Sequence, residues 1–169
     1  MPYRRTIWKL NEEYAPPPEK ADDVDLQRVG LIQSIEAAKK RTPPIPIARL
    51  PELAEKPKAP PNVGELDPKA FAAYLSDLCV YGVGIKTAVC LLAVTSGGQF
   101  PPMDEKLAAG LLKLGFIDGE DGNALNSPNI ETFTSVYVRK VVPRWRKARS
   151  KGEPPEDIDR RWARGRHET

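Results

Sequence analysis

Two residues in the middle of the sequence, Lys86 and Asp104, have the side chains needed for covalent chemistry at a sugar carbon. They lie 18 residues apart. An amine that faces one pocket with a carboxylate can attack C1′ of a sugar and form a Schiff base, while the carboxylate stabilises positive charge or accepts a proton. The amine must be partly deprotonated, which the apolar neighbours Ile85, Val89 and Cys90 favour. Each residue by itself also has a structural explanation, as a lysine in a first helical turn and as a helix N-cap.

A turn with glycines at alternate positions, Gly82 and Gly84, precedes the lysine. Glycine permits positive φ, and its missing side chain lets a phosphate approach the backbone N–H groups at the start of the next helix. The residues before the turn have the spacing of an apolar helix, which argues against a nucleotide-binding loop of the kind that follows a strand. The turn therefore predicts phosphate contacts at the positions Tyr81, Gly82, Val83, Gly84 and Thr87.

Positive charge is concentrated at one end of the chain, although the whole sequence carries only +3. Residues 139–169 contain eleven basic and five acidic side chains, a local net charge of +6, which leaves −3 for residues 1–138. This distribution favours a polyanionic partner, and duplex DNA first. The candidate DNA contacts in this segment are Arg144, Arg146, Lys147 and Arg149. A solvated surface helix that only aids solubility is the alternative.

Composition excludes several other classes of site and protein. With one histidine and two separate cysteines, Cys79 and Cys90, the chain cannot supply a four-cysteine iron–sulfur cluster or a structural zinc site. The cysteines lie in apolar helical patterns, which indicates core thiols rather than a disulfide. We expect no membrane span and no secretory leader, and therefore a cytoplasmic, nucleoid-associated protein.

The elements that must position these residues are helical, so we predict an all-α fold. We expect an extended arm over residues 1–20 and a single helical domain over 21–169. This domain would start with a helix from about 22 to 40 and a proline-rich loop over 41–61. Two helices joined by the glycine turn, a helix-hairpin-helix, follow over about 68–95, the first of them opened by Asp67-Pro68.

Four more segments complete the expected fold. Asp104 caps a helix that stops at Gly115, and residues 118–126 are rich in Gly, Asp and Asn and are expected to form a loop. A helix opened by Ser127-Pro128 should then kink or end at Pro143. A last helix opens at Pro154-Pro155. The tryptophans Trp8, Trp145 and Trp162 are candidates either for the core or for stacking on bases.

The stretch from Gly82 to Ala88 resembles the helix-hairpin-helix signature of the endonuclease III superfamily of DNA glycosylases. Asp104 also falls where that family has its catalytic aspartate, so the resemblance covers about residues 66–117. It implies a DNA N-glycosylase with AP-lyase activity that removes a damaged or modified base, with Lys86 and Asp104 as catalytic residues. It also implies a hairpin whose backbone carbonyls can hold K⁺ or Na⁺. We expect no other cofactor, because the cysteine count excludes an iron–sulfur cluster.

The sequence departs from that family in several ways. Tyr81 stands where the family has proline, Glu105 and Lys106 follow the aspartate, and the family's four-cysteine cluster is missing. The proline-rich segment 41–61 occupies the place of several family helices, which implies an open pocket or one that a protein partner completes. Three alternatives stay open: a non-catalytic DNA-binding module, a base-modifying enzyme on the same scaffold, and a protein-interaction protein of the immunity type.

Overall fold

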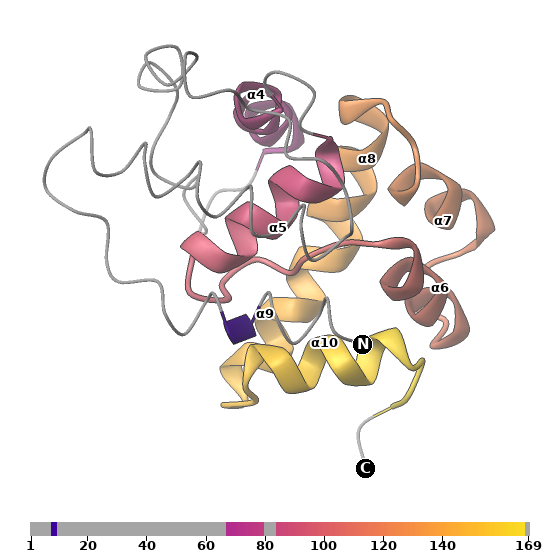
Figure 1. Cartoon of the computed structure of the whole chain (residues 1–169). Coiled ribbons are helices and arrows are strands. Elements are labelled where there is room, and N and C mark those ends of the chain that lie inside the picture. The colour runs from indigo at the N-terminus through magenta and orange to yellow at the C-terminus, as the bar shows by residue number, and fades with distance from the viewer. Residues whose placement is uncertain (1–7, 10–66, 80–83, 168–169) are drawn as a thin grey trace, which may run out of the picture.

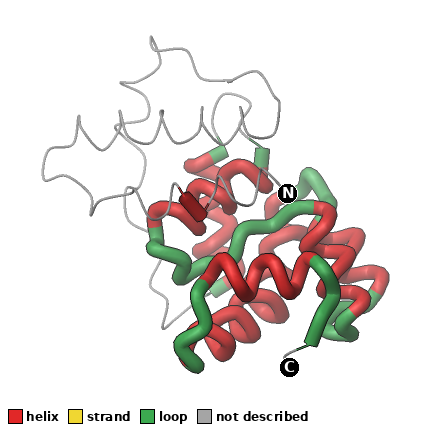
Figure 2. The backbone as a smooth tube through the Cα atoms, turned by 60° about the horizontal axis from the view of Figure 1, so that its bottom comes forward, coloured by secondary structure: helices red, strands yellow, loops and turns green. Residues whose placement is uncertain are grey.

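The computed structural model describes residues 8–9, 67–79 and 84–167, and every regular element in these ranges is helical (Figure 1). Figure 2 shows the same helices joined by short loops. The prediction of a helical fold is therefore confirmed for the described part of the chain. In chain order the helices are α4 (Pro68–Leu78), α5 (Ile85–Thr95), α6 (Glu105–Lys113), α7 (Gly119–Leu125), α8 (Ile130–Val136), the π-helix η2 (Tyr137–Val141), α9 (Val142–Ser150) and α10 (Pro155–Ala163).

Several predicted elements lie outside the described residues. They are the arm over 1–20 apart from residues 8–9, the helix from about 22 to 40, the proline-rich loop over 41–61 and the turn at 80–83. The helices on both sides of that turn are described. The first ends at Leu78 and the second begins at Ile85, close to the predicted bounds.

Short polar residues set the helix starts, as the sequence predicts. Asp67 accepts a hydrogen bond from the backbone N–H of Ala70 at the start of α4, where Pro68 is the first helical residue. Asn129 caps α8 and accepts from the N–H of Thr132, so this helix begins two residues after the predicted Ser127-Pro128 opening. The last helix, α10, begins at Pro155 as expected.

Gly115 ends α6 for a conformational reason. Its φ is +75°, in the left-handed region that favours glycine. The N–H of Gly115 donates to the carbonyl of Leu112, and the N–H of Phe116 donates to the carbonyl of Leu111. This pair of bonds is the Schellman arrangement, which satisfies carbonyls that the helix end leaves without intrahelical partners. The predicted stop at Gly115 is confirmed.

The expected loop over 118–126 is wrong, because residues Gly119–Leu125 form helix α7. Asp118 and Asp121 form a reciprocal capping box, in which each carboxylate accepts the other residue's backbone N–H, at 2.9 and 3.0 Å. Leu125 is fully buried, and Lys140 of η2 pairs with Asp121. Residues that favour turns also cap helices, so composition alone does not distinguish the two outcomes.

The helical run continues past Pro143 to Ser150 and does not end there. Pro143 has no N–H, and its ring crowds the carbonyl four residues earlier in a regular α-helix. The chain widens into the π-helix η2 just before the proline, and the N–H of Val142 donates to the carbonyl of Tyr137, five residues back. Of the two predicted outcomes at Pro143, a kink or an end, the end is wrong, and the helix is instead distorted by a π turn just before the proline.

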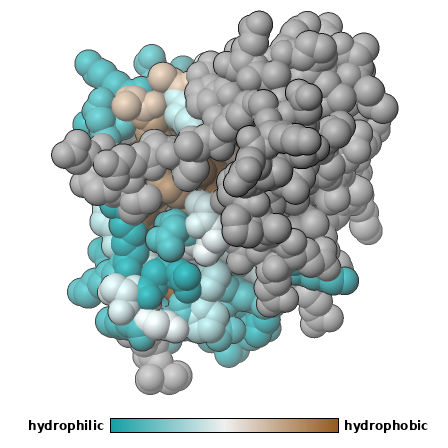
Figure 3. All heavy atoms as spheres, turned by 90° about the vertical axis from the view of Figure 1, so that its left-hand side faces the viewer, coloured by the Kyte–Doolittle hydropathy of each residue, from teal (hydrophilic) through white to brown (hydrophobic). Residues whose placement is uncertain are grey.

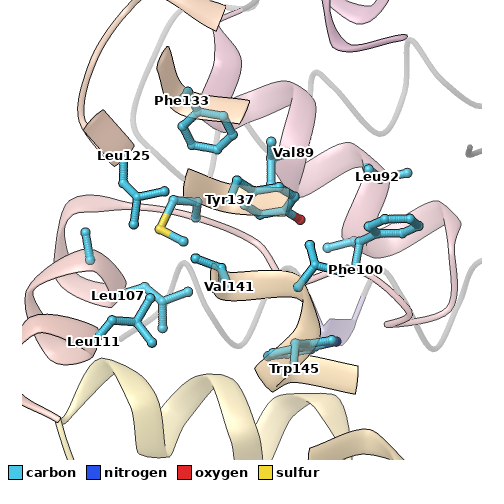
Figure 4. Close-up of a cluster of buried hydrophobic side chains, with 14 of the residues drawn as sticks. Val89, Leu92, Phe100, Leu107, Leu111, Leu125, Phe133, Tyr137, Val141 and Trp145 are labelled. Carbon is cyan, nitrogen blue, oxygen red and sulfur yellow. The ribbon is translucent and has the colours of Figure 1, made fainter. Parts of the chain in front are cut away.

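The core surrounds the continuous run of α8, η2 and α9. In Figure 1 this run descends through the middle of the molecule, α4 and α7 pack against α8, and α10 packs against α6. Figure 4 shows side chains of α5, α6 and α7 packed against those of this run. The labelled core residues are Val89, Leu92, Phe100, Leu107, Leu111, Leu125, Phe133, Tyr137, Val141 and Trp145, all of them buried.

The three tryptophans belong to this core. Trp8 stacks on Trp145 with ring centroids 6.0 Å apart, and Trp162 meets Trp145 edge-on at 5.6 Å. The indole N–H of Trp8 donates to the buried Asp159 carboxylate at 2.9 Å. Because all three rings are at most 2% exposed, they are core residues in this structure and not a surface for stacking on bases.

Candidate active site and basic pocket

Lys86 is the second residue of α5, and its side chain reaches across to the turn between α7 and α8. Its Nζ donates a hydrogen bond to Oδ1 of Asn126 at 2.8 Å. Asn126 is the C-cap residue of α7, and its own amide nitrogen donates to the carbonyl of Gly122 at 3.1 Å. That second bond orients the amide so that its oxygen faces the lysine.

A cavity of about 350 Å³ opens around this lysine. We call it the Lys86 pocket, and the described residues that line it are Cys79, Gly84, Ile85, Lys86, Thr87, Asn126, Ser127, Pro128 and Ile130. It therefore lies where the end of α4, the start of α5 and the α7–α8 turn meet. Burial raises the pKa of the Cys79 thiol to about 11, so this thiol is protonated at neutral pH and is a poor nucleophile.

Asp104 is the N-cap of α6, as predicted, and its Oδ1 accepts from the N–H of Leu107 at 2.7 Å. Two buried side chains hold the loop that leads to it. Trp145 donates its indole N–H to the carbonyl of Gly98 at 2.8 Å, and the hydroxyl of Tyr137 donates to the carbonyl of Pro101 at 2.6 Å. Asp104 is half-buried and is not among the described residues that line the Lys86 pocket.

The predicted phosphate contacts at the glycine turn fall partly outside the described residues. Tyr81, Gly82 and Val83 belong to the turn at 80–83, together with the backbone carbonyls that would hold K⁺ or Na⁺. Gly84 is exposed and has open space around its Cα. Thr87 is fully buried and belongs to the wall of the Lys86 pocket. Because it does not face solvent, it is not placed to contact DNA in this structure.

A second cavity, of about 360 Å³, lies beside α9 and α10. We call it the basic pocket. Arg144 lies over the ring of Phe116, with its guanidinium carbon 4.2 Å from the ring centroid. On the face that Figure 3 shows, hydrophilic side chains lie at the upper and the lower end of the described part, with hydrophobic side chains between them. The described residues that line the pocket are Phe116, Arg144, Lys147, Ala148, Lys151, Arg161, Trp162 and His167.

The four predicted DNA contacts of the basic segment do not share one face of α9. Arg144 and Lys147 are exposed and line the basic pocket, whereas Arg146 and Arg149 are half-buried and do not. Burial lowers the pKa of the Arg146 guanidinium, which lies 6.0 Å from the Phe100 ring centroid. Arg149 donates to the backbone carbonyl of Glu153 at 2.9 Å.

Sequence reasoning missed the partners of both sites. Asn126 ends the segment that is predicted to be a plain loop, and Ser127 is predicted only to open the next helix. No local pattern connects Asn126 with a lysine 40 residues earlier. The spacing of Arg144, Lys147 and Lys151 does carry a signal, because residues three and four apart share a helical face. That spacing places Arg146 on a different helical face from these three residues. The net charge of the segment alone does not distinguish Arg146 from them.

The described part of the chain contains no group of three or more histidine, cysteine, aspartate or glutamate side chains arranged to hold a metal ion. Within the same residues, no helix has the length and apolar character needed to cross a membrane. Comparison of the chain with models of known protein families, with curated proteins and with solved structures finds no match.

Proposed function

We propose that this chain binds duplex DNA and removes a damaged or modified base as an N-glycosylase, with lyase activity through Lys86. The observation that carries the proposal is the Lys86 pocket. A primary amine lies in a cavity that opens to the surface, and Asn126 holds it at 2.8 Å. The pairing of a glycine-bearing turn with this lysine adds support, since the turn is suited to hold the DNA backbone beside the amine.

The reaction would begin at C1′ of the nucleotide to be repaired. The bond between C1′ and the base breaks, and the base leaves with the electron pair and takes up a proton. The Lys86 nitrogen bonds to C1′ and loses a proton, and the sugar ring opens to give a protonated Schiff base. Loss of a proton from C2′ then expels the 3′ phosphate, which cuts the strand.

Two other side chains would support these steps. Asn126 accepts a hydrogen bond from the amine and would orient it toward the sugar. The carboxylate of Asp104 would stabilise the positive charge that develops on the sugar as the base departs. Because Asp104 does not line the Lys86 pocket, this role requires the DNA itself to bridge the two residues.

DNA binding would combine two sources of attraction. The backbone N–H groups at the start of α5 would hold one phosphate, helped by the positive end of that helix. The basic segment would add contacts that do not depend on base sequence. If four to six of its cations reach phosphates, log K should fall against log[salt] with a slope of about −4 to −5. A slope near zero would contradict the electrostatic part of the proposal.

Borohydride trapping tests the chemistry directly. The full-length protein is mixed with duplexes that carry an abasic site or a modified base, and sodium borohydride reduces any Schiff base to a stable adduct. We expect an adduct with the wild type, none with Lys86→Ala, and an unchanged yield with Lys106→Ala, an exposed lysine of α6. Absence of an adduct with every duplex, while a known lyase traps, would overturn the lyase proposal.

A non-catalytic DNA-binding module is the second candidate. It is favoured by one observation, that the carboxylate of Asp104 serves as an N-cap and lies outside the Lys86 pocket. In this case the wild type should bind duplex DNA with the expected salt dependence, form no adduct and release no base. Lys86→Ala should then weaken binding only slightly, by the loss of one charge.

A further inference from the structure

The first described residues of the chain lie against its last two helices. Figure 1 shows residues 8–9, in indigo, beside α9 and α10. Trp8 is 2% exposed, and its ring stacks on that of Trp145 in α9 with an interplanar angle of 15°. Its indole N–H donates to the carboxylate of Asp159 in α10 at 2.9 Å. A side chain from the start of the sequence thus fills a site that helices near its end provide.

The walls of this site are held by contacts in which Trp8 takes no part. The indole N–H of Trp145 donates to the carbonyl of Gly98 at 2.8 Å, and the Trp145 ring meets Trp162 edge-on at 5.6 Å. The helix that carries Asp159, α10, packs on α6. Gly98 borders the site, since a Cβ there would lie 3.7 Å from the Trp8 ring. We therefore expect the site to keep its shape when Trp8 is absent.

The chemistry of the walls selects an indole ring. The face of Trp145 stacks on a flat aromatic ring, and the carboxylate of Asp159, which is 1% exposed, accepts a hydrogen bond from the edge of that ring. A phenyl ring could stack but could not donate. A buried carboxylate discriminates strongly against a ligand that displaces water without supplying a donor. The site is therefore matched to a planar ring with an N–H at its edge.

From this arrangement we propose that Trp145, Asp159 and Gly98 form a receptor for an indole ring, which Trp8 occupies as an intramolecular ligand. We call it the indole site. The ligand class is a tryptophan side chain or a free indole. Two sources can supply the tryptophan, the same chain or a second copy that exchanges its first residues. The inference does not depend on Lys86 or on DNA binding.

Chemical rescue of the full-length Trp8→Ala variant tests the proposal. The probes are indole and benzothiophene, a ring of similar size and shape that has no N–H, and circular dichroism follows thermal unfolding as each is added. Trp8→Ala should unfold at a lower temperature than the wild type. Indole should raise the midpoint saturably, and benzothiophene should bind about 10-fold more weakly, because it cannot donate to Asp159.

Three controls show whether the response belongs to this site. The wild type should respond to neither probe, because Trp8 fills the site. Trp8→Phe keeps a stacked ring in place and should not respond to indole either. Phe133→Ala opens a cavity elsewhere in the core, where the lost ring stacks on Tyr137. Binding to that apolar cavity should differ less than about 2-fold between the two probes.

The outcomes separate the possibilities. If Trp8→Ala does not fold alone, a cooperative transition that appears only with indole supports the proposal in the same way. Absence of any saturable effect of indole on Trp8→Ala overturns it, and so does an equal effect of the two probes. Sedimentation of the wild type distinguishes the sources. A monomer assigns the bound indole to the same chain, whereas a dimer that Trp8→Ala abolishes assigns it to a second copy.

Discussion

Lys86 and Asn126 are 40 residues apart in the sequence, and their side chains meet with Nζ and Oδ1 2.8 Å apart. The contact connects the start of α5 to the end of α7, on either side of the pocket that we propose as the site of chemistry. A neutral amide oxygen is a useful partner for a nucleophilic amine, because it accepts a hydrogen bond from the lysine without adding the negative charge that favours its protonated form.

Replacing that amide with a carboxylate should therefore slow the reaction. In Asn126→Asp the new negative charge favours the ammonium form of Lys86, and we expect the rate of borohydride trapping at neutral pH to fall about 10-fold. Raising the pH should restore it. The control is Asn123→Asp, an exposed residue of the same helix, which should trap at close to the wild-type rate. A pH profile that does not move in Asn126→Asp would contradict the positioning role of Asn126.

Two substitutions of Asp104 separate its cap from its charge. Asp104→Asn keeps an oxygen for the N–H of Leu107, so the free energy of unfolding should stay within about 0.5 kcal/mol of the wild type, whereas Asp104→Ala should lower it by about 1 kcal/mol. Urea denaturation measures both. Base release should be lost in both variants if the charge acts on the sugar. Full base release by Asp104→Asn would leave Asp104 with the structural role alone.

Gly110 of α6 packs against the backbone of α10 at Trp162 and Ala163. A Cβ at this position would overlap the backbone carbonyl of Trp162, so Gly110→Ala should lower the free energy of unfolding by about 1–3 kcal/mol. Gly122 is a helical glycine of α7 with open space around it, and Gly122→Ala should be neutral or stabilising by up to about 1 kcal/mol. Thermal unfolding of the pair checks the packing of α10 on α6. Equal stability of the two variants would be inconsistent with it.

The ion pair between Asp121 and Lys140 should make stability fall in acid. The hydrogen bond from Lys140, at 2.6 Å, holds the pKa of Asp121 below its ordinary value of 3.8. Because the folded pKa is the lower one, the stabilisation is present above about pH 4 and is lost as the pH falls through the folded pKa. Asp121→Asn should give a shallower loss of stability below about pH 4 than the wild type. The control is Asp157→Asn, an exposed carboxylate of α10, which should follow the wild-type curve.

Truncation before residue 144 should unfold the chain. It would remove the buried residues Trp145, Ile158 and Trp162. Loss of a single large core side chain costs about 3–5 kcal/mol, and a whole domain is stable by only about 5–15 kcal/mol. Circular dichroism of residues 1–143 should therefore show no cooperative melt. A cooperative transition near that of the full chain would mean that α9 and α10 are not part of the core. Salt dependence must therefore be tested by point substitutions in the full-length protein.

The local elements of the fold were predictable because their signals are local. Asp67-Pro68, Asp104 and Gly115 act through hydrogen bonds and backbone angles within a few residues, so they set helix starts and stops wherever the chain goes. The apolar faces of α4 and α6 follow from the helical period in the same way. The order of the residues also shows directly that eleven of the 26 basic residues lie in 139–169, with a local net charge of +6.

Only the tertiary structure decided what these elements do together. The segment 118–126 becomes a helix because Leu125 is buried in the core and Lys140 pairs with Asp121, and neither partner is visible in that stretch of sequence. The contact of Lys86 with Asn126, and the separation of Arg144 and Lys147 from Arg146, follow from how the helices pack around the α8–α9 run. Burial and long-range contacts depend on the arrangement of the whole chain, which local propensity does not contain.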